Sequence, residues 1–265
     1  MMKTAFYLFV IKEKRKRKIF SFSYLYGKTK TFGGGLSHLK YKFSDSDEYY
    51  TPIETVENIF QKLPACVKEK KIWFPCDNDE SAFVKFAQKE RLIYKNSSDD
   101  FQKRQDLLVW CDIVITNPPF TLTYTFCKFI KNKQFAFVTP YVRTHNVFNN
   151  LPNVRFFSIP RKFLRPDGTQ EKVGVVCANS FGITDDRKYL SSEAFFEYED
   201  KTGLPILNSI LNFPMYEKAP KEMLVPCSFL NLNYKNWKPV KVFDHPYVNG
   251  KSKFRRLLIR KMFLN

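Results

Sequence analysis

The fold of this chain is decided by the stretch WCDIVITNPPF, residues Trp110–Phe120. Its first part, Trp110–Ile115, is apolar and rich in β-branched residues, which is typical of a strand buried on both faces of a parallel sheet. The strand must end near Asn117, because the two prolines that follow fix φ at about −65° and donate no backbone hydrogen bond. Open α/β sheets bind their ligands in such loops, at the carboxyl ends of the strands. The stretch therefore predicts a buried strand followed by a rigid ligand-binding loop.

The residues of this loop suit chemistry on an exocyclic amine. The amine of adenine is a poor nucleophile because its lone pair is conjugated into the ring. The Asn117 amide oxygen and the Pro118 carbonyl could each accept one amine hydrogen and so localise the lone pair on nitrogen. Phe120 could stack on a base flipped from its helix, a contact worth about 1–3 kcal/mol. The alternative interpretation is a strand that merely ends in Asn-Pro, which is a common turn signal.

Asn117–Phe120 resembles the catalytic loop of S-adenosylmethionine-dependent amino methyltransferases, and its final phenylalanine resembles the DNA adenine-N6 branch. Other segments narrow the resemblance to the EcoRI-like adenine-specific methyltransferases. These segments are Asp47–Pro52, Ile72–Lys85, Asp100–Phe101, Val225–Leu230, Asn249–Lys251 and Leu257–Arg260. The resemblance covers about Leu36 to Lys261, with a weak middle part. The order of the motifs is that of the γ-type enzymes.

The resemblance implies a Rossmann-like α/β fold with a mostly parallel seven-stranded sheet, and S-adenosylmethionine as cofactor. A strand over Lys71–Phe74, an acidic turn and a helix over Glu80–Gln88 would form the cofactor corner of a doubly wound sheet. Asp77 would accept the cofactor's α-amino group, and Asp79 or Glu80 is the second candidate. Ser81 belongs to the same turn motif. A plain helix cap is the alternative role for Asp77.

Two further segments are assigned to the cofactor by the same resemblance. Asp100 would accept the amine of the cofactor's adenine, and Phe101 would pack on its face. Tyr49, Thr51 and Pro52 would pack over the cofactor. Thr51 and Pro52 also predict the start of a helix over Ile53–Leu63, with a hydroxyl cap and proline in the first turn.

The remaining pattern predicts further elements of the sheet. The expected strands are Leu92–Tyr94, Phe135–Pro140, Val154–Ile159 and Val173–Ala178, and a helix is expected over Thr121–Ile130. Asn96 stands after the second strand, where an acid for the ribose hydroxyls is often expected. After Phe181 the sequence has no clean periodicity.

Composition favours a polyanionic partner. The formal net charge is +18, and residues 1–32 carry nine Lys or Arg against one Glu, so the rest of the chain keeps a charge of +10. The six cysteines include no C-x-x-C pair, which is poor spacing for a metal site and fits a reducing cytoplasm. No apolar run approaches the roughly 18 residues that a membrane span needs. No metal is expected.

Three regions are predicted. Residues 1–35 would be a basic extension, either disordered or a mis-assigned start; residues 36–180 would bind S-adenosylmethionine and carry catalysis; residues 181–265 would complete the fold and recognise the target. Asn231, Lys235 and Trp237 are candidates for contacts near the DNA groove.

The predicted function is that of a site-specific DNA adenine-N6 methyltransferase acting on a flipped adenine in duplex DNA. Such an enzyme would be monomeric, and it could accompany a restriction endonuclease or act as an orphan or phage-like enzyme. One alternative is an RNA or protein-amide methyltransferase with the same Asn-Pro-Pro loop, although those usually have Tyr at the fourth position. Another is a catalytically decayed homologue that binds DNA without turnover.

Overall fold

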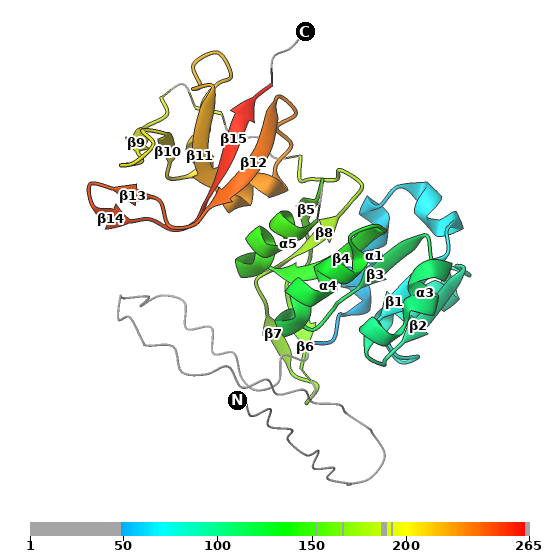
Figure 1. Ribbon diagram of the computed structural model, residues 1–265. Helices are drawn as coiled ribbons and strands as arrows, with labels where there is room; N and C mark the ends of the chain where they lie inside the picture. Colours follow the sequence, from blue (N-terminus) through cyan, green and yellow to red (C-terminus); the bar gives the residue numbers. More distant parts are fainter. Residues whose placement is uncertain (1–48, 152, 166, 187–189, 192, 263–265) are drawn as a thin grey trace, which may run out of the picture. The chain divides into compact units, whose positions relative to one another are not determined.

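A computed structural model describes residues 49–262 of the chain, except 152, 166, 187–189 and 192 (Figure 1). The chain divides into two units, residues 1–42 and 43–265, and every described residue belongs to the second. The predicted extension 1–35 therefore lies outside the described residues, as does Asp47–Glu48 of the resembling segments.

A six-stranded sheet carries the strand predicted from Trp110–Ile115. In spatial order its strands are β2 (Tyr94–Ser97), β1 (Ile72–Pro75), β3 (Ile113–Thr116), β4 (Gln134–Pro140), β8 (Val175–Asn179) and β5 (Arg155–Ser158) (Figure 1). The first four are mutually parallel, and β8 is antiparallel to both of its neighbours. The sheet is mostly parallel, as expected, but the described residues give it six strands where seven were predicted.

Helices cover both faces of this sheet. The helices are α1 (Ile53–Lys62), α2 (Ala82–Lys89), α3 (Gln105–Trp110), α4 (Thr123–Ile130) and α5 (Thr144–Asn150). Successive strand residues point to opposite faces, so Ile113 and Ile115 pack with α1 and α2, whereas Val114 packs with α3, α4 and α5. This is the doubly wound arrangement. It explains why the buried strands have no polar alternation.

The chain reverses its direction of winding between β1 and β3. It passes from β1 through α2 to the edge strand β2, and then crosses back to place β3 on the other side of β1. In open α/β sheets the crevice at such a switch point is where ligands bind. The carboxyl ends of β1 and β3 are Pro75 and Thr116, directly before the acidic turn and the Asn-Pro-Pro loop.

Three local predictions need correction. The strand predicted over Trp110–Ile115 is Ile113–Thr116, because Trp110 is the last residue of α3 and Cys111 is its C-cap. The second strand is Tyr94–Ser97 rather than Leu92–Tyr94, because it pairs in register with Ile72–Pro75, so Asn96 lies inside the strand. The expected hydroxyl cap of α1 is not formed: the N-cap is Pro52, without a side-chain hydrogen bond, and Thr51 stands one residue too early.

A hairpin and a second sheet were not anticipated from the sequence. The hairpin consists of β6 (Lys162–Leu164) and β7 (Gln170–Lys172), inserted between β5 and β8. The second sheet has the order β12 (Trp237–Phe243), β15 (Arg256–Lys261), β11 (Glu222–Pro226), β10 (Pro205–Leu207) and β9 (Phe196–Tyr198), and is antiparallel except between β10 and β11. The small hairpin of β13 (Tyr247–Val248) and β14 (Lys251–Ser252) precedes β15 (Figure 1). The remaining short helices are the 3-10 turns η1 (Ala65–Glu69), η2 (Phe101–Lys103), η3 (Phe120–Leu122), η4 (Tyr141–Arg143), η5 (Ile210–Asn212) and η6 (Cys227–Asn231).

One hydrophobic cluster joins the two sheets. Phe156 and Val176 of the first sheet belong to the same buried cluster as Val225 and Ile259 of the second, and we call it the shared core. Trp237 lies in this core with 4% of its surface exposed, and Asn231 is also buried, so neither faces a groove; Lys235 is exposed. Among the described residues, no helix is long and apolar enough to cross a membrane.

Candidate active site

The ends of β1 and β3 are joined by a hydroxyl group. The Thr116 hydroxyl is shared between the Pro75 carbonyl oxygen and Asp77 Oδ2, the latter at 2.8 Å. The side chain of Asp77 is therefore turned inward, to the switch point, and not along the following helix. The helix cap of α2 is Ser81, whose Oγ accepts from the Val84 backbone N–H at 3.2 Å. The alternative role of Asp77 as a plain helix cap does not match this geometry.

Asp77 is a buried carboxyl group in a polar setting. Burial raises its pKa to about 7, although hydrogen bonds from Thr116 and Ser81 favour the charged form and oppose the shift. None of the ion pairs among the described residues includes Asp77. A cationic ligand group at this position would supply the missing counter-charge.

The residue before Asp77 has a constrained backbone. Cys76 has φ of 67°, in the left-handed region that a residue with a Cβ rarely adopts. Its thiol pKa is raised by burial and further by the negative charges of Asp77 and Asp100. Because the charge of Asp100 raises the pKa of the Cys76 thiol, the loop that contains Asp100 must lie near the turn after β1. Strained backbone at a strand end is characteristic of functional sites.

Asp79 is held at the neighbouring strand. Asn96 Nδ2, on β2, donates to Asp79 Oδ1 at 3.0 Å and to the Asp77 carbonyl oxygen at 3.4 Å. The amide that replaces the expected ribose acid thus brings a carboxylate to the end of β2. Glu80 does not join it, because its side chain is exposed and pairs with Lys85.

The second acidic element is divided between two environments. Asp100 Oδ1 accepts from the Gln102 backbone N–H at 3.1 Å and caps η2. Phe101 is only 2% exposed and packs edge-on against Phe126 and Phe129, with ring centroids 5.3 and 5.4 Å away. The structure therefore brings Asp100 near the turn after β1 and Phe101 into the shared core.

Asn117 presents an acceptor that has no partner among the described residues. Its Nδ2 donates to the Tyr49 carbonyl oxygen at 2.8 Å. Because a carbonyl only accepts, this bond fixes the amide orientation and turns Oδ1 the other way. Oδ1 is buried and has no hydrogen-bond partner among the described residues. Leaving a buried acceptor unpaired costs about 1–3 kcal/mol, so such an atom needs an explanation.

Phe120 lies under Tyr49. Their ring centroids are 5.9 Å apart with planes 27° from parallel, and Phe120 is 5% exposed. A flipped base could therefore stack on Phe120 only from the side that Tyr49 leaves free, or after a small movement. Of the two prolines that follow Asn117, Pro118 is buried and Pro119 is exposed.

In the part of the chain that the structure describes, two further buried oxygens near Asn117 lack partners. They are Thr51 Oγ1, two residues after Tyr49, and Thr139 Oγ1, at the end of β4 next to β3. Thr51 was predicted to contact the cofactor. Thr139 was missed, although Thr-Pro at the end of a predicted strand, beside the Asn-Pro-Pro strand, is a signal that could have found it.

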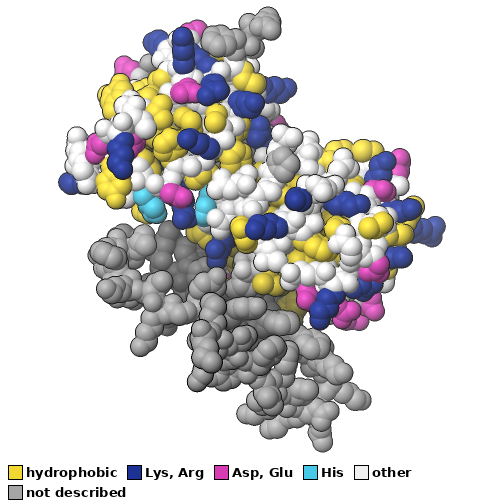
Figure 2. All heavy atoms as spheres, viewed as in Figure 1, with side chains coloured by type: hydrophobic (Ala, Val, Ile, Leu, Met, Phe, Trp, Pro, Cys, Tyr) yellow, Lys and Arg dark blue, Asp and Glu magenta, His cyan; other side chains and the backbone are white. Residues whose placement is uncertain are grey.

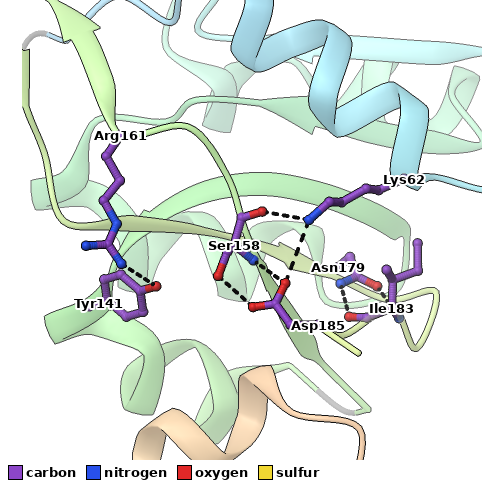
Figure 3. A network of polar contacts seen from close by, with 7 residues as sticks. All are labelled: Lys62, Tyr141, Ser158, Arg161, Asn179, Ile183 and Asp185. Carbon is purple, nitrogen blue, oxygen red and sulfur yellow. Dashed lines mark hydrogen bonds and ion pairs between the residues drawn. The ribbon is translucent and has the colours of Figure 1, made fainter. Parts of the chain in front are cut away.

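A second polar cluster lies at the end of β5 (Figure 3). Ser158 donates from its backbone N–H and its hydroxyl to the two Asp185 oxygens, at 3.0 and 2.6 Å, and Lys62 Nζ lies 3.7 Å from Asp185. It borders a cavity of about 430 Å³. The Asp185 backbone N–H also donates to the Asn231 carbonyl oxygen at 2.9 Å. These side chains satisfy one another, so the cluster joins α1, β5 and η6 rather than presenting a reactive group.

The described residues contain no group of three or more His, Cys, Asp or Glu that could hold a metal ion. Neither a protein-family model nor a curated protein matches the sequence. Function must therefore be inferred from the groups at the ends of β1, β2 and β3.

Proposed function

We propose that the chain is a site-specific DNA methyltransferase that transfers a methyl group from S-adenosylmethionine to the N6 amine of a flipped adenine. The observation that carries the proposal is the buried Oδ1 of Asn117, which no described residue pairs with, while the amide nitrogen already donates to the Tyr49 carbonyl oxygen. The atom lies directly after β3, at the switch point of a doubly wound sheet.

The chemistry of an aromatic amine explains why an acceptor is needed there. As the amine nitrogen attacks, its lone pair leaves conjugation and its N–H bonds become better donors. An acceptor fixed in advance stabilises that change without reorganising, and one such contact is worth on the order of 10²–10³ in rate. Asn117 Oδ1 and the Pro118 carbonyl are suited to receive the two hydrogens, and Phe120 to contact the base.

The cofactor corner fits S-adenosylmethionine by the nature of its groups. This cofactor supplies an electrophilic methyl group when bound. Asp77, buried and lacking a cation, suits its α-ammonium group; Asp79 and Asp100 suit its hydroxyls and adenine amine. The described sheet is consistent with the Rossmann-like fold of such enzymes, and a seventh strand remains part of the proposal.

DNA is the proposed substrate for two reasons. The loop ends in Phe120, and a phenylalanine at this position resembles the loop of the DNA adenine-N6 methyltransferases. The chain also carries a net charge of +18, which favours binding to the phosphate backbone. Lys and Arg side chains are spread over the face drawn in Figure 2, across the parts that belong to both sheets. An RNA or protein-amide methyltransferase is the rival within the same chemistry.

A binding protein without turnover is the second candidate. It is favoured by the position of Phe101 in the shared core, where the ring cannot cover a cofactor adenine. Measurement of S-adenosylmethionine binding by calorimetry separates it from an enzyme, because a decayed protein would bind DNA but not the cofactor.

The test of the proposal is methyl transfer by the purified chain. Labelled S-adenosylmethionine is incubated with duplex DNA, with RNA or with protein extract, and the DNA nucleosides are then identified by mass spectrometry. We expect N6-methyladenine in DNA, and none with the Asn117→Ala variant. Label that enters only RNA or only protein would refute DNA as the substrate.

A further inference from the structure

The β6–β7 hairpin is attached to the segment that precedes α1. Tyr50 and Leu164 exchange two backbone hydrogen bonds, from Tyr50 N to Leu164 O at 2.8 Å and from Leu164 N to Tyr50 O at 3.0 Å. The segment at Tyr49–Tyr50 is therefore held beside β6. Its neighbour across the hairpin is β7, where Glu171 lies opposite Phe163.

Tyr49 makes three contacts that connect this hairpin to the catalytic loop. Its hydroxyl donates to Glu171 Oε2 at 3.1 Å, its carbonyl oxygen accepts from Asn117 Nδ2, and its ring stacks on Phe120. Glu171 in turn forms an ion pair with Arg165. One tyrosine thus donates a charge-assisted hydrogen bond on one side and contacts two loop residues on the other.

We propose that Glu171 is a positioning residue for Asn117 and acts through Tyr49; this inference rests on the proposed function. Glu171 fixes the Tyr49 side chain, and the fixed tyrosine presents its carbonyl oxygen to Asn117 Nδ2. That bond keeps Oδ1 as the group that meets the substrate amine. Nothing in the sequence pattern connects residue 171 with residue 117.

The orientation of the Asn117 amide is the property that Glu171 controls in this proposal. Without a fixed acceptor for Nδ2, the amide can turn by half a rotation and present its NH₂ group to the substrate. The amine would then face a donor instead of an acceptor, and the lone pair would not be localised. Small displacements at a reacting centre can cost about 10² in rate, so a looser Tyr49 would lower the rate even with the cofactor bound.

The experiment compares Glu171→Ala, Tyr49→Phe and their double variant with a matched control. The control is Glu222→Ala, since Glu222 also lies on a strand and pairs with an arginine, Arg260; the side chains of Glu171 and Glu222 are 37% and 34% exposed. Single-turnover methyl transfer is measured with cofactor and DNA both saturating. Thermal unfolding and cofactor affinity are measured for each variant.

We expect Glu171→Ala and Tyr49→Phe each to slow the transfer step about tenfold, roughly the effect of losing one hydrogen bond to a charged group. The double variant should be no slower than either single one, because both remove the same link. Glu171→Gln retains an acceptor and should recover most of the rate. Cofactor affinity and unfolding temperature should match those of the control.

A second readout does not depend on turnover. The side-chain amide of Asn117, assigned by its loss in Asn117→Asp, is followed by nitrogen-15 NMR. Its signal should shift and its hydrogen exchange accelerate in Glu171→Ala, but not in Glu222→Ala. An amide and a rate that respond equally to both substitutions would overturn the proposal. If the wild-type chain transfers no methyl group to DNA, the proposed function fails, while the amide signal still decides whether Glu171 orients Asn117.

Discussion

Asn117 is the side chain on which the proposed chemistry most directly depends. Asn117→Ala removes Oδ1 and the hydrogen bond to Tyr49, and neither loss changes the bond between Thr116 and Asp77, the residue proposed to hold the cofactor. We therefore expect turnover to fall by about 10²–10³ or more, while the dissociation constant for S-adenosylmethionine changes less than about threefold. Steady-state kinetics and calorimetry measure the two effects separately. A parallel loss of cofactor affinity would show that the role assigned to Asn117 is wrong.

Asp77 makes a prediction about pH. If its carboxylate holds the cofactor's ammonium group, binding requires the charged form, and the pKa of about 7 means that this form is scarce in acid. Affinity should rise by up to about tenfold per pH unit below pH 7 and level off above it. Asp77→Asn keeps the size and an acceptor for Thr116, and should bind more weakly with little pH dependence. Calorimetric titration from about pH 5.5 to about 8.5 measures the cofactor affinity of the unsubstituted chain and of Asp77→Asn. An unchanged slope in Asp77→Asn would rule out Asp77 as the titrating group.

The same raised pKa has a consequence for stability. In the unfolded chain the Asp77 carboxyl loses its proton near its ordinary pKa of 3.8, whereas in the folded chain it keeps the proton up to about 7. Its contribution to folding stability is therefore complete in acid and is lost as the pH rises through that interval. Bound cofactor should oppose this loss.

The sequence was sufficient to locate candidate residues whose position follows from their neighbours in the chain. Asn117 was located because the prolines after it end a buried strand, and Asp77 because it follows another strand end. Phe101 and Thr51 could not be placed this way. Whether an aromatic ring lines a site or fills the core depends on Phe126 and Phe129, which come later in the chain. The Thr51 hydroxyl, unpaired among the described residues, depends on which residue caps α1: the helix begins at Ile53 as predicted, but its N-cap is Pro52 and not Thr51.

Among the elements, β1, β4, β5 and β8 were predicted within two residues, whereas β3 begins three residues later than predicted and the edge strand β2 is shifted towards the carboxyl end. A buried strand such as Ile113–Thr116 is a continuous apolar run. The edge strand contains Lys95 and Asn96, and its register is set by pairing with β1 rather than by its own pattern. The second sheet was missed for a related reason. Its strands β9 and β10 have only three residues each, and β12 is interrupted by a register shift between Pro239 and Lys241, which breaks the alternation.

The burial of Trp237 and the exposure of Lys235, two candidates for DNA contact, predict how substitutions there change the free energy of unfolding. Trp237 is buried and packs edge-on against Phe213 and Tyr216, so Trp237→Ala should lower the free energy of unfolding by about 3–5 kcal/mol. Lys235 is exposed, and Lys235→Ala should change stability by less than about 0.5 kcal/mol. Urea unfolding measures both. Equal losses of stability would contradict the burial assigned to them.

Across the whole described chain, the shared core limits how target recognition can be tested. Leu207, Val225 and Trp237 pack in the same cluster as Phe156 and Val176, so an exchange of all of residues 181–265 would replace one side of a packed interior. Substitutions in contacting core residues are not independent. An exchange should therefore keep the inward residues and replace the exposed ones.

We expect the exposed residues of 181–265 to determine which adenines are methylated. The groups at Asp77, Asn117 and Phe120 would act on any adenine, so discrimination requires side chains that reach the edges of neighbouring bases. The second sheet and the loops around it carry exposed Lys235, Lys238 and Lys241, as well as the exposed Phe254. A hybrid with the exposed residues of a relative of different specificity, and the shared core unchanged, should unfold as the parent does and methylate the relative's sites. Methylated positions on genomic DNA are read by sequencing, with Asn117→Ala in the hybrid as the blank. A hybrid that is active and still methylates the parent's sites would place recognition elsewhere in the chain.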